Sequence, residues 1–371
     1  MNWILPDPDP FGLPLAPWAI QALLLLTFTL HVIVMNVVVA GGPVALWAIW
    51  RGRSAKLRGT ARAGQYHALA AGLAGLQPVA VAFTITTGVA PLLFVQVLYG
   101  QLFYTSSVLM AWIWLSVVPL LVVGYYACYG LSFSMNGQDA RLARWLALGA
   151  SLAFVLVAFI YTNNMTLMLQ PARFRGLYLA SDAGLHANLA DWTLWPRFLH
   201  VVVGASAVTG VVVAWFGRAR SRLDAVTGAW LARFGMRLFG LATLVQLAVG
   251  AWFVLAQPEP VRRVLLGGGP DSMLLAVGII LALMAIPLVR LNMFLGAVAL
   301  VVVIADMVVV RHRVRTLTLA PYFQLDTLAV NPQTGVFLLF VVLLVAGLLT
   351  VAWMVRKLAA GGRTATSGVG R

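Results

Sequence analysis

The sequence predicts an all-α membrane protein built from nine transmembrane helices. Of its 371 residues, 62% are hydrophobic and only 9% are charged, a composition outside the range of soluble globular domains. Apolar runs of about 20 residues or more, the length that spans a bilayer, recur from one end of the chain to the other. Read as helices, these runs cover residues 17–48, 67–98, 105–133, 145–168, 197–216, 238–256, 272–289, 291–310 and 336–355.

The short loops between these runs leave no room for a soluble domain. We therefore expect a single transmembrane domain over residues 1–371, of which 358–371 form a flexible cytoplasmic tail. Lys and Arg are retained on the cytoplasmic side of a membrane, and most of the 25 in this chain fall in the segments on the side opposite the N-terminus. We expect the N-terminus outside, the C-terminus in the cytoplasm, and the chain in a bacterial inner membrane.

The formal charge of +15 follows the same asymmetry between the two sides. A basic inner face indicates attraction to anionic membrane lipid, and we expect no nucleic-acid partner. The single cysteine, Cys128, excludes a disulfide within the chain and a cysteine-ligated iron–sulfur cluster. Because the sequence has no CxxCH motif, the chain attaches no c-type haem of its own.

His31 lies inside the first apolar run, between leucine and valine. Hydrocarbon offers an imidazole no water, so a histidine at this depth needs a partner. One interpretation is a hydrogen bond to a neighbouring helix. The other is ligation of a metal or a haem iron, for which neutral imidazole is a common ligand.

His200 lies near the start of the fifth run, and Gly204, Ala207 and Gly210 follow it at helical spacing. Small residues let a flat macrocycle or another helix approach the backbone closely. The position fits a haem ligand, and it fits equally a histidine that lies near a helix end without a ligand.

Other polar groups within the apolar runs allow several roles. Asp306 has to pair with a base such as Arg311, take up a proton, or serve as a proton relay in which Gln96 also takes part. Met165 and Met168 offer thioethers to a haem iron, although methionine more often fills gaps in a core.

The longest loops expected on the outer face cover residues 169–196 and 311–335. Loops on a rigid helical scaffold often carry binding roles, so their arginines suit docking of another protein, or anchoring of helix ends at lipid headgroups. His312, in the second loop, is expected to be solvated. The arginines concerned are Arg173, Arg175, Arg311, Arg313 and Arg315.

Together these segments resemble subunit I of cytochrome bd quinol oxidase. His31 matches the haem-binding histidine of that family's first helix. The fourth run is similar to its asparagine–methionine–proline signature, and the fifth to its histidine–glycine–threonine–glycine segment. The matching residues are Asn163, Met165 or Met168, and Pro171 in the fourth run, and His200, Gly204, Thr209 and Gly210 in the fifth. The resemblance implies one or two b-type haems on His31 and His200, and a link to quinone.

Three departures limit what the resemblance implies. The second helix of the family carries glutamates that serve oxygen reduction, whereas Gly88–Gln96 has no acid. The long quinol-binding loop is reduced to a short segment around residues 261–271. In the seventh run alanine stands where the family has its axial methionine, with Met273 one turn away. We therefore expect a relay of electrons and no oxygen reduction by this chain alone.

Three functions follow from these observations. The first is an electron-transfer subunit of a respiratory complex, linked to quinol oxidation, with a multihaem c-type cytochrome or a paired bd-like membrane subunit as partner. The second is a haem-free structural anchor for other respiratory subunits. The third is a proton or solute pathway that uses Asp306, Gln96 and His31.

Overall fold

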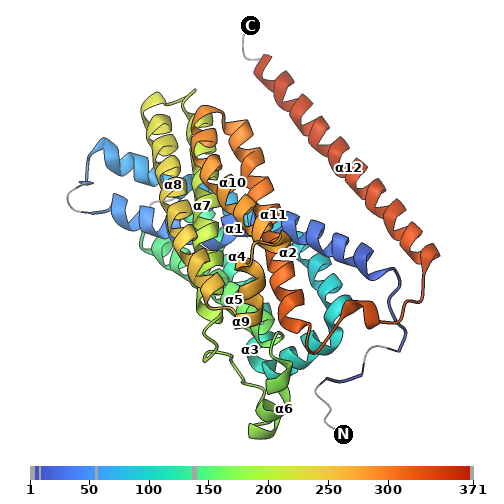
Figure 1. The fold of residues 1–371 in the computed structure, drawn as a ribbon. Helices are drawn as coiled ribbons and strands as arrows, with labels where there is room; N and C mark the ends of the chain where they lie inside the picture. The colour runs from blue at the N-terminus through green and yellow to red at the C-terminus, as the bar shows by residue number, and fades with distance from the viewer. Residues whose placement is uncertain (1–4, 8–9, 55–56, 136–139, 368–371) are drawn as a thin grey trace.

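The computed structural model describes residues 5–7, 10–54, 57–135 and 140–367, and it is helical almost throughout (Figure 1). Over these residues, nine helical segments are long and apolar enough to cross a membrane, which confirms the predicted fold class. The helices are α1 (Pro17–Gly52), α2 (Ala61–Leu109), α3 (Ala111–Leu115), α4 (Val117–Ser134), α5 (Ala140–Leu167), α6 (Pro171–Ala180), α7 (Leu194–Arg220), α8 (Ala225–Leu255), α9 (Glu259–Leu266), α10 (Pro270–Leu291), α11 (Met293–Leu319) and α12 (Thr334–Ser367), with a 3-10 turn, η2 (Leu325–Thr327).

Helix α1 lies at the centre of the bundle, where it contacts α2, α5, α7 and α11. Helices that follow one another along the chain pack as hairpins, namely α1–α2, α4–α5, α7–α8 and α10–α11. We call the end of the bundle at the α7–α8 turn the hairpin end, and the opposite end the α9 end (Figure 1). Because α1 carries His31, the packing surrounds that histidine with helices.

Helices α7 and α8 approach each other at glycines. A Cβ on Gly217 would lie 2.3 Å from the backbone nitrogen of Ala232, and one on Gly235 would lie 2.4 Å from that of Ala214. No side chain fits at such separations, so the two backbones lie in direct contact. Small residues are a common basis of helix association in membranes because they allow this approach.

Several helices extend beyond the apolar runs that predicted them. Helix α2 has 49 residues and bends at Tyr99, whose φ of −128° and ψ of 29° are not helical; a break at about this point was predicted. Helix α8 begins at Ala225, capped by the Asp224 carboxylate, which accepts a hydrogen bond from the backbone N–H of Thr227 at 3.0 Å. Hydropathy marks the apolar core of a span, and it misses the polar turns that continue the helix into the headgroup region.

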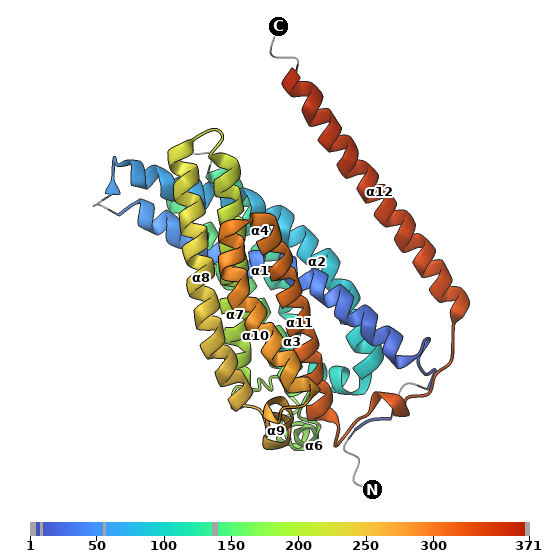
Figure 2. The same ribbon diagram turned by 45° about the horizontal axis from the view of Figure 1, so that its top comes forward.

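Helix α12 stands apart from the bundle in both views (Figures 1 and 2). No part of its most apolar window is buried. The tether that precedes it pairs with the N-terminal segment: Leu13 N–H donates to Ala329 O at 2.7 Å, and Asn331 N–H donates to Leu13 O at 2.8 Å. The helix continues to Ser367, within the tail predicted as flexible, and residues 368–371 of that tail lie outside the described residues.

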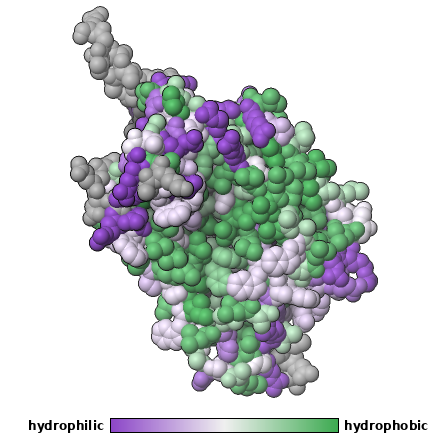
Figure 3. Space-filling view, turned by 90° about the vertical axis from the view of Figure 1, so that its left-hand side faces the viewer, coloured by the Kyte–Doolittle hydropathy of each residue, from purple (hydrophilic) through white to green (hydrophobic). Residues whose placement is uncertain are grey.

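The bundle surface fits a bilayer. Figure 3 shows a broad hydrophobic area with hydrophilic side chains gathered at its borders. Among the exposed apolar side chains are Leu241 on α8, which is 65% exposed, and Phe294 on α11, which is 67% exposed. Hydrocarbon around the protein accommodates such side chains without a packing partner.

Candidate functional site

The ring of His31 is held in place by α2. Its Nδ1 lies 3.0 Å from the backbone oxygen of Thr84, which can only accept a hydrogen bond, so Nδ1 donates. In a neutral imidazole the other ring nitrogen, Nε2, then carries the free lone pair. Gly88, one turn further along α2, makes room for the ring, since a Cβ there would lie 2.8 Å from His31 Cε1. Metal-ligating histidines commonly donate their second nitrogen to a backbone carbonyl in this way.

One aromatic ring separates His31 from an arginine. The Phe28 ring lies 6.2 Å from the His31 ring, centroid to centroid. The guanidinium carbon of Arg311, on α11, lies 4.5 Å from the centroid of the Phe28 ring. Such a cation–π contact holds an arginine in place without neutralising its charge.

His200 on α7 has the same kind of neighbours, a phenylalanine from α8 and an arginine from α7 itself. Its ring lies 6.2 Å from that of Phe253, and the guanidinium carbon of Arg197 lies 5.1 Å from the centroid of the Phe253 ring. A Cβ on Gly250 would lie 3.4 Å from His200 Cε1. The Nδ1 atom of His200 is buried and has no hydrogen-bond partner. A buried polar atom without a partner is costly, which makes this nitrogen a candidate ligand atom.

The two arginines belong to a cluster of three at the α9 end, which we call the arginine cluster: Arg197, Arg311 and Arg315. Arg315 is 8% exposed, and its guanidinium carbon lies 5.0 Å from the centroid of the Tyr99 ring. The three guanidinium groups are close enough to repel one another. Asp191 attracts Arg197, but no described carboxylate lies within ion-pair distance of any of the three. The cluster can therefore receive an anionic group.

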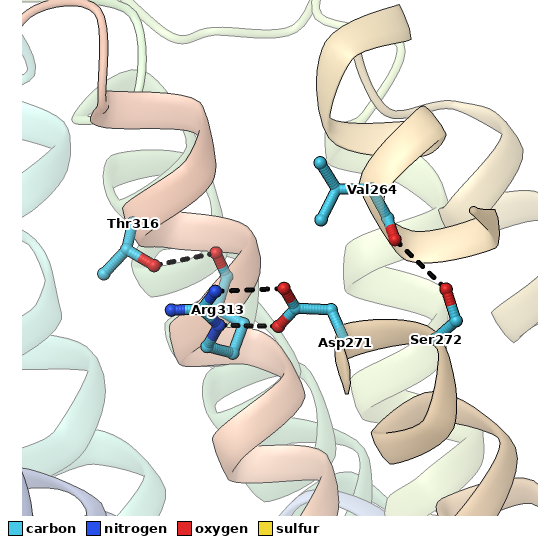
Figure 4. Close-up of polar contacts among 5 residues, drawn as sticks. All are labelled: Val264, Asp271, Ser272, Arg313 and Thr316. Carbon is cyan, nitrogen blue, oxygen red and sulfur yellow. Dashed lines mark hydrogen bonds and ion pairs between the residues drawn. The ribbon is translucent and has the colours of Figure 1, made fainter. Parts of the chain in front are cut away.

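One basic residue of the second predicted loop is already engaged in an ion pair. Arg313 donates two hydrogen bonds to the Asp271 carboxylate, at 2.6 and 2.9 Å, and this pair joins α11 to α10 (Figure 4). Arg315 is buried, and His312, expected to be solvated, is 8% exposed. The expectation was wrong for His312, because α11 continues to Leu319 and packs the first part of the predicted loop against the bundle.

Asp306 lies in the middle of α11, and its Oδ2 atom is buried without a hydrogen-bond partner. It packs against α10 at Gly278, where a Cβ would lie 2.2 Å from that oxygen. In the described part of the chain it forms no ion pair with Arg311. Gln96 accepts a 3.5 Å hydrogen bond from the Tyr104 hydroxyl, and no hydrogen bond found in the structure joins it to Asp306. The proton relay through Asp306 and Gln96 therefore stays a prediction.

The three methionines considered as ligands lie in different surroundings. Met165 and Met168 are buried in the apolar core at the α9 end, which also contains Tyr99 and Phe103. Met273, near the start of α10, is 65% exposed. The structure thus brings the two histidines near one cluster of arginines. The contacts described for the histidines involve none of these three methionines.

Sequence reasoning missed the arginine cluster and the residues that position the histidines. Nothing in the sequence indicated that Thr84 and Gly88 contact the His31 ring. Two spacings were informative: Arg197 lies one turn before His200, and Arg311 lies one turn before Arg315. Residues at such spacings share a helix face, so each pair marks one face of its helix.

No family model and no curated protein matches this chain. Among solved structures it is similar to the bd oxidase from Geobacillus thermodenitrificans, with a TM-score of 0.61 and 12% sequence identity. The superposition covers 92% of this chain and 98% of that chain, so the likeness extends over nearly the whole of both. The chain therefore has a bd-oxidase-like fold.

Proposed function

We propose that this chain is a membrane subunit of a respiratory complex that holds b-type haem through His31 and His200 and relays electrons between the quinone pool and a redox partner. One observation carries the proposal. Each histidine has a ring nitrogen available for ligation, and each lies beside a phenylalanine that packs under an arginine of the same unneutralised cluster. The bd-oxidase-like fold supports a respiratory role.

The residues fit a haem in two chemical respects. The Thr84 carbonyl holds the His31 ring and leaves Nε2 free, while His200 has a buried nitrogen without a partner. A haem also carries two propionates, and Arg197, Arg311 and Arg315 supply positive charge for such groups. Guanidinium groups bind carboxylates strongly because they can donate two parallel hydrogen bonds.

A bound haem would supply one-electron chemistry. The chain's own residues would orient the ligands and balance charge. The hydrogen bond to Thr84 raises the basicity of the His31 ring and fixes its direction. The arginine cluster balances anionic charge at the α9 end. No acid lies in Gly88–Gln96, so we propose electron relay without oxygen reduction. A multihaem c-type cytochrome or a paired bd-like subunit would receive or donate the electrons.

The absorbance spectrum of the purified, dithionite-reduced protein tests this proposal. We expect a b-type α band that weakens in His31→Ala and in His200→Ala, because each variant removes one proposed ligand. His186→Ala is the control, since His186 lies in the loop after α6, where its Nε2 contacts the Ser181 backbone oxygen at 2.7 Å. A colourless wild-type preparation, or an unchanged band in both ligand variants, would overturn the proposal.

The second function is a haem-free structural anchor of a respiratory complex, and it is favoured because no part of the most apolar window of α12 is buried against the bundle. In that case His31 serves only to join α1 to α2 through Thr84. The same ligand variants distinguish the two functions. An anchor predicts a colourless protein in which His31→Ala lowers thermal stability and leaves the spectrum unchanged.

A further inference from the structure

A second group of arginines lies at the hairpin end, far from the histidines along α7. It surrounds a cavity of about 320 Å³ between α7, α8 and α10. All the charged side chains that line the cavity are basic. The lining residues are Arg218, Arg233, Arg237 and Arg290, with Ala232 and Met236.

Two of the helices fix this arrangement directly. Arg218 Nη2 donates to the backbone oxygens of Arg290, at 3.2 Å, and Val289, at 3.4 Å. Those carbonyls belong to the last turn of α10, where a cation is favoured by the helix dipole. Arg233 and Arg237 are one turn apart on α8 and share a face. Three separate helices thus contribute arginines to the lining of one cavity.

In the described part of the chain, no acidic side chain forms an ion pair with these four arginines. Among the described residues the ion pairs are Arg263–Glu259 and Arg313–Asp271, and both lie at the α9 end. The acid nearest in sequence, Asp224, caps α8 by accepting from Thr227 N–H. Four guanidinium groups without a carboxylate form a site suited to phosphate, whose oxygens accept paired hydrogen bonds from arginine.

The surface beside the cavity is apolar and faces the membrane. On α8, Leu241 and Leu244 continue the stripe of Arg233 and Arg237, one and nearly two turns beyond Arg237. These leucines are 65% and 54% exposed. On α10, Leu283 lies on the same side as Arg290, two turns before it, and is 42% exposed. A basic cavity that continues into an exposed apolar track matches a phosphate headgroup attached to acyl chains.

We propose that the four-arginine cavity binds the phosphate of an anionic phospholipid, whose acyl chains lie along α8 and α10. Basic pockets between transmembrane helices on the cytoplasmic side suit such headgroups, and the hairpin end is the end that the arginine distribution predicts to face the cytoplasm. The site is independent of the proposed haem, because it uses other residues at the other end of the bundle.

Native mass spectrometry of the delipidated, full-length protein tests the proposal. Phosphatidylglycerol and phosphatidylcholine are added separately, and the bound lipid is counted. We expect phosphatidylglycerol to bind the wild type, and Arg233→Gln/Arg237→Gln to weaken that binding roughly tenfold or more, since each arginine near a membrane surface contributes on the order of 1 kcal/mol. Weak phosphatidylcholine binding should not change.

The matched control is Arg58→Gln/Arg62→Gln, which removes two exposed arginines at the same end but outside the cavity. It should change phosphatidylglycerol binding less than twofold. Equal losses in both double variants would show attraction to surface charge alone and overturn the proposal. Inorganic phosphate is the third arm: if phosphate alone raises the melting temperature as much as phosphatidylglycerol does, the cavity is a free-anion site. Should the α8 double variant not fold, Arg290→Gln replaces it with the same expected direction.

Discussion

At the scale of single residues, Gly88 is the position on which the geometry of His31 depends. We predict that Gly88→Ala displaces the imidazole, because the new methyl group would lie 2.8 Å from Cε1 and 2.9 Å from Nδ1. Overpacking of this kind costs about 1–3 kcal/mol. Thermal unfolding in detergent should show the loss, and a b-type α band should weaken if His31 is a ligand.

Gly75→Ala is the control for this prediction, since Gly75 is on the same helix and a Cβ there meets nothing within 4 Å. Replacing an unconstrained helical glycine by alanine is expected to stabilise by about 0.5–1 kcal/mol. If both variants behave alike, the contact between Gly88 and His31 has no energetic importance.

The sequence alone predicted His31 and His200 as candidate ligands because an ionisable side chain in an apolar run is conspicuous. It did not predict the arginine cluster. Arg197 belongs to α7, and Arg311 and Arg315 belong to α11, so only tertiary packing brings them together. A residue that is unusual within its own helix could be predicted from the sequence. A cluster formed by side chains of two helices could not.

At the scale of helices, the α7–α8 contact is sensitive to substitution because it is formed by backbone atoms. We predict that Gly235→Ala destabilises the protein by about 3 kcal/mol or more, because the added methyl group would meet the backbone of Gly210 and Ala214, each at 2.4 Å. Backbone atoms cannot rotate away as a side chain can, so the helices have to separate. Thermal unfolding in detergent measures the effect.

Gly240→Ala serves as the comparison, because Gly240 is on the same helix and has open space around its Cα. We expect it to leave the melting temperature unchanged or raise it slightly. A Gly235→Ala variant as stable as Gly240→Ala would contradict the backbone contact. Hydropathy predicted that α7 and α8 exist. It could not predict the distance between them, because that distance depends on which small residues face each other.

At the scale of the whole molecule, the orientation in the membrane stays a prediction from the arginine distribution. We expect Asp182→Cys, in the loop between α6 and α7, to react with a membrane-impermeant maleimide in intact spheroplasts. Arg58→Cys, in the loop between α1 and α2, should react only after permeabilisation. Cys128 is 1% exposed, so the unaltered protein provides an unlabelled background. The opposite labelling pattern would show that the chain has the inverse orientation in the membrane.

The tether before α12 has a mechanical consequence. Leu13 pairs with that tether on both sides, through Ala329 and Asn331, and α1 begins only a few residues after Leu13, at Pro17. A force applied to α12 therefore reaches the start of the helix that carries His31 through a short, hydrogen-bonded linkage. The tether therefore couples the position of α12 to the N-terminal end of α1.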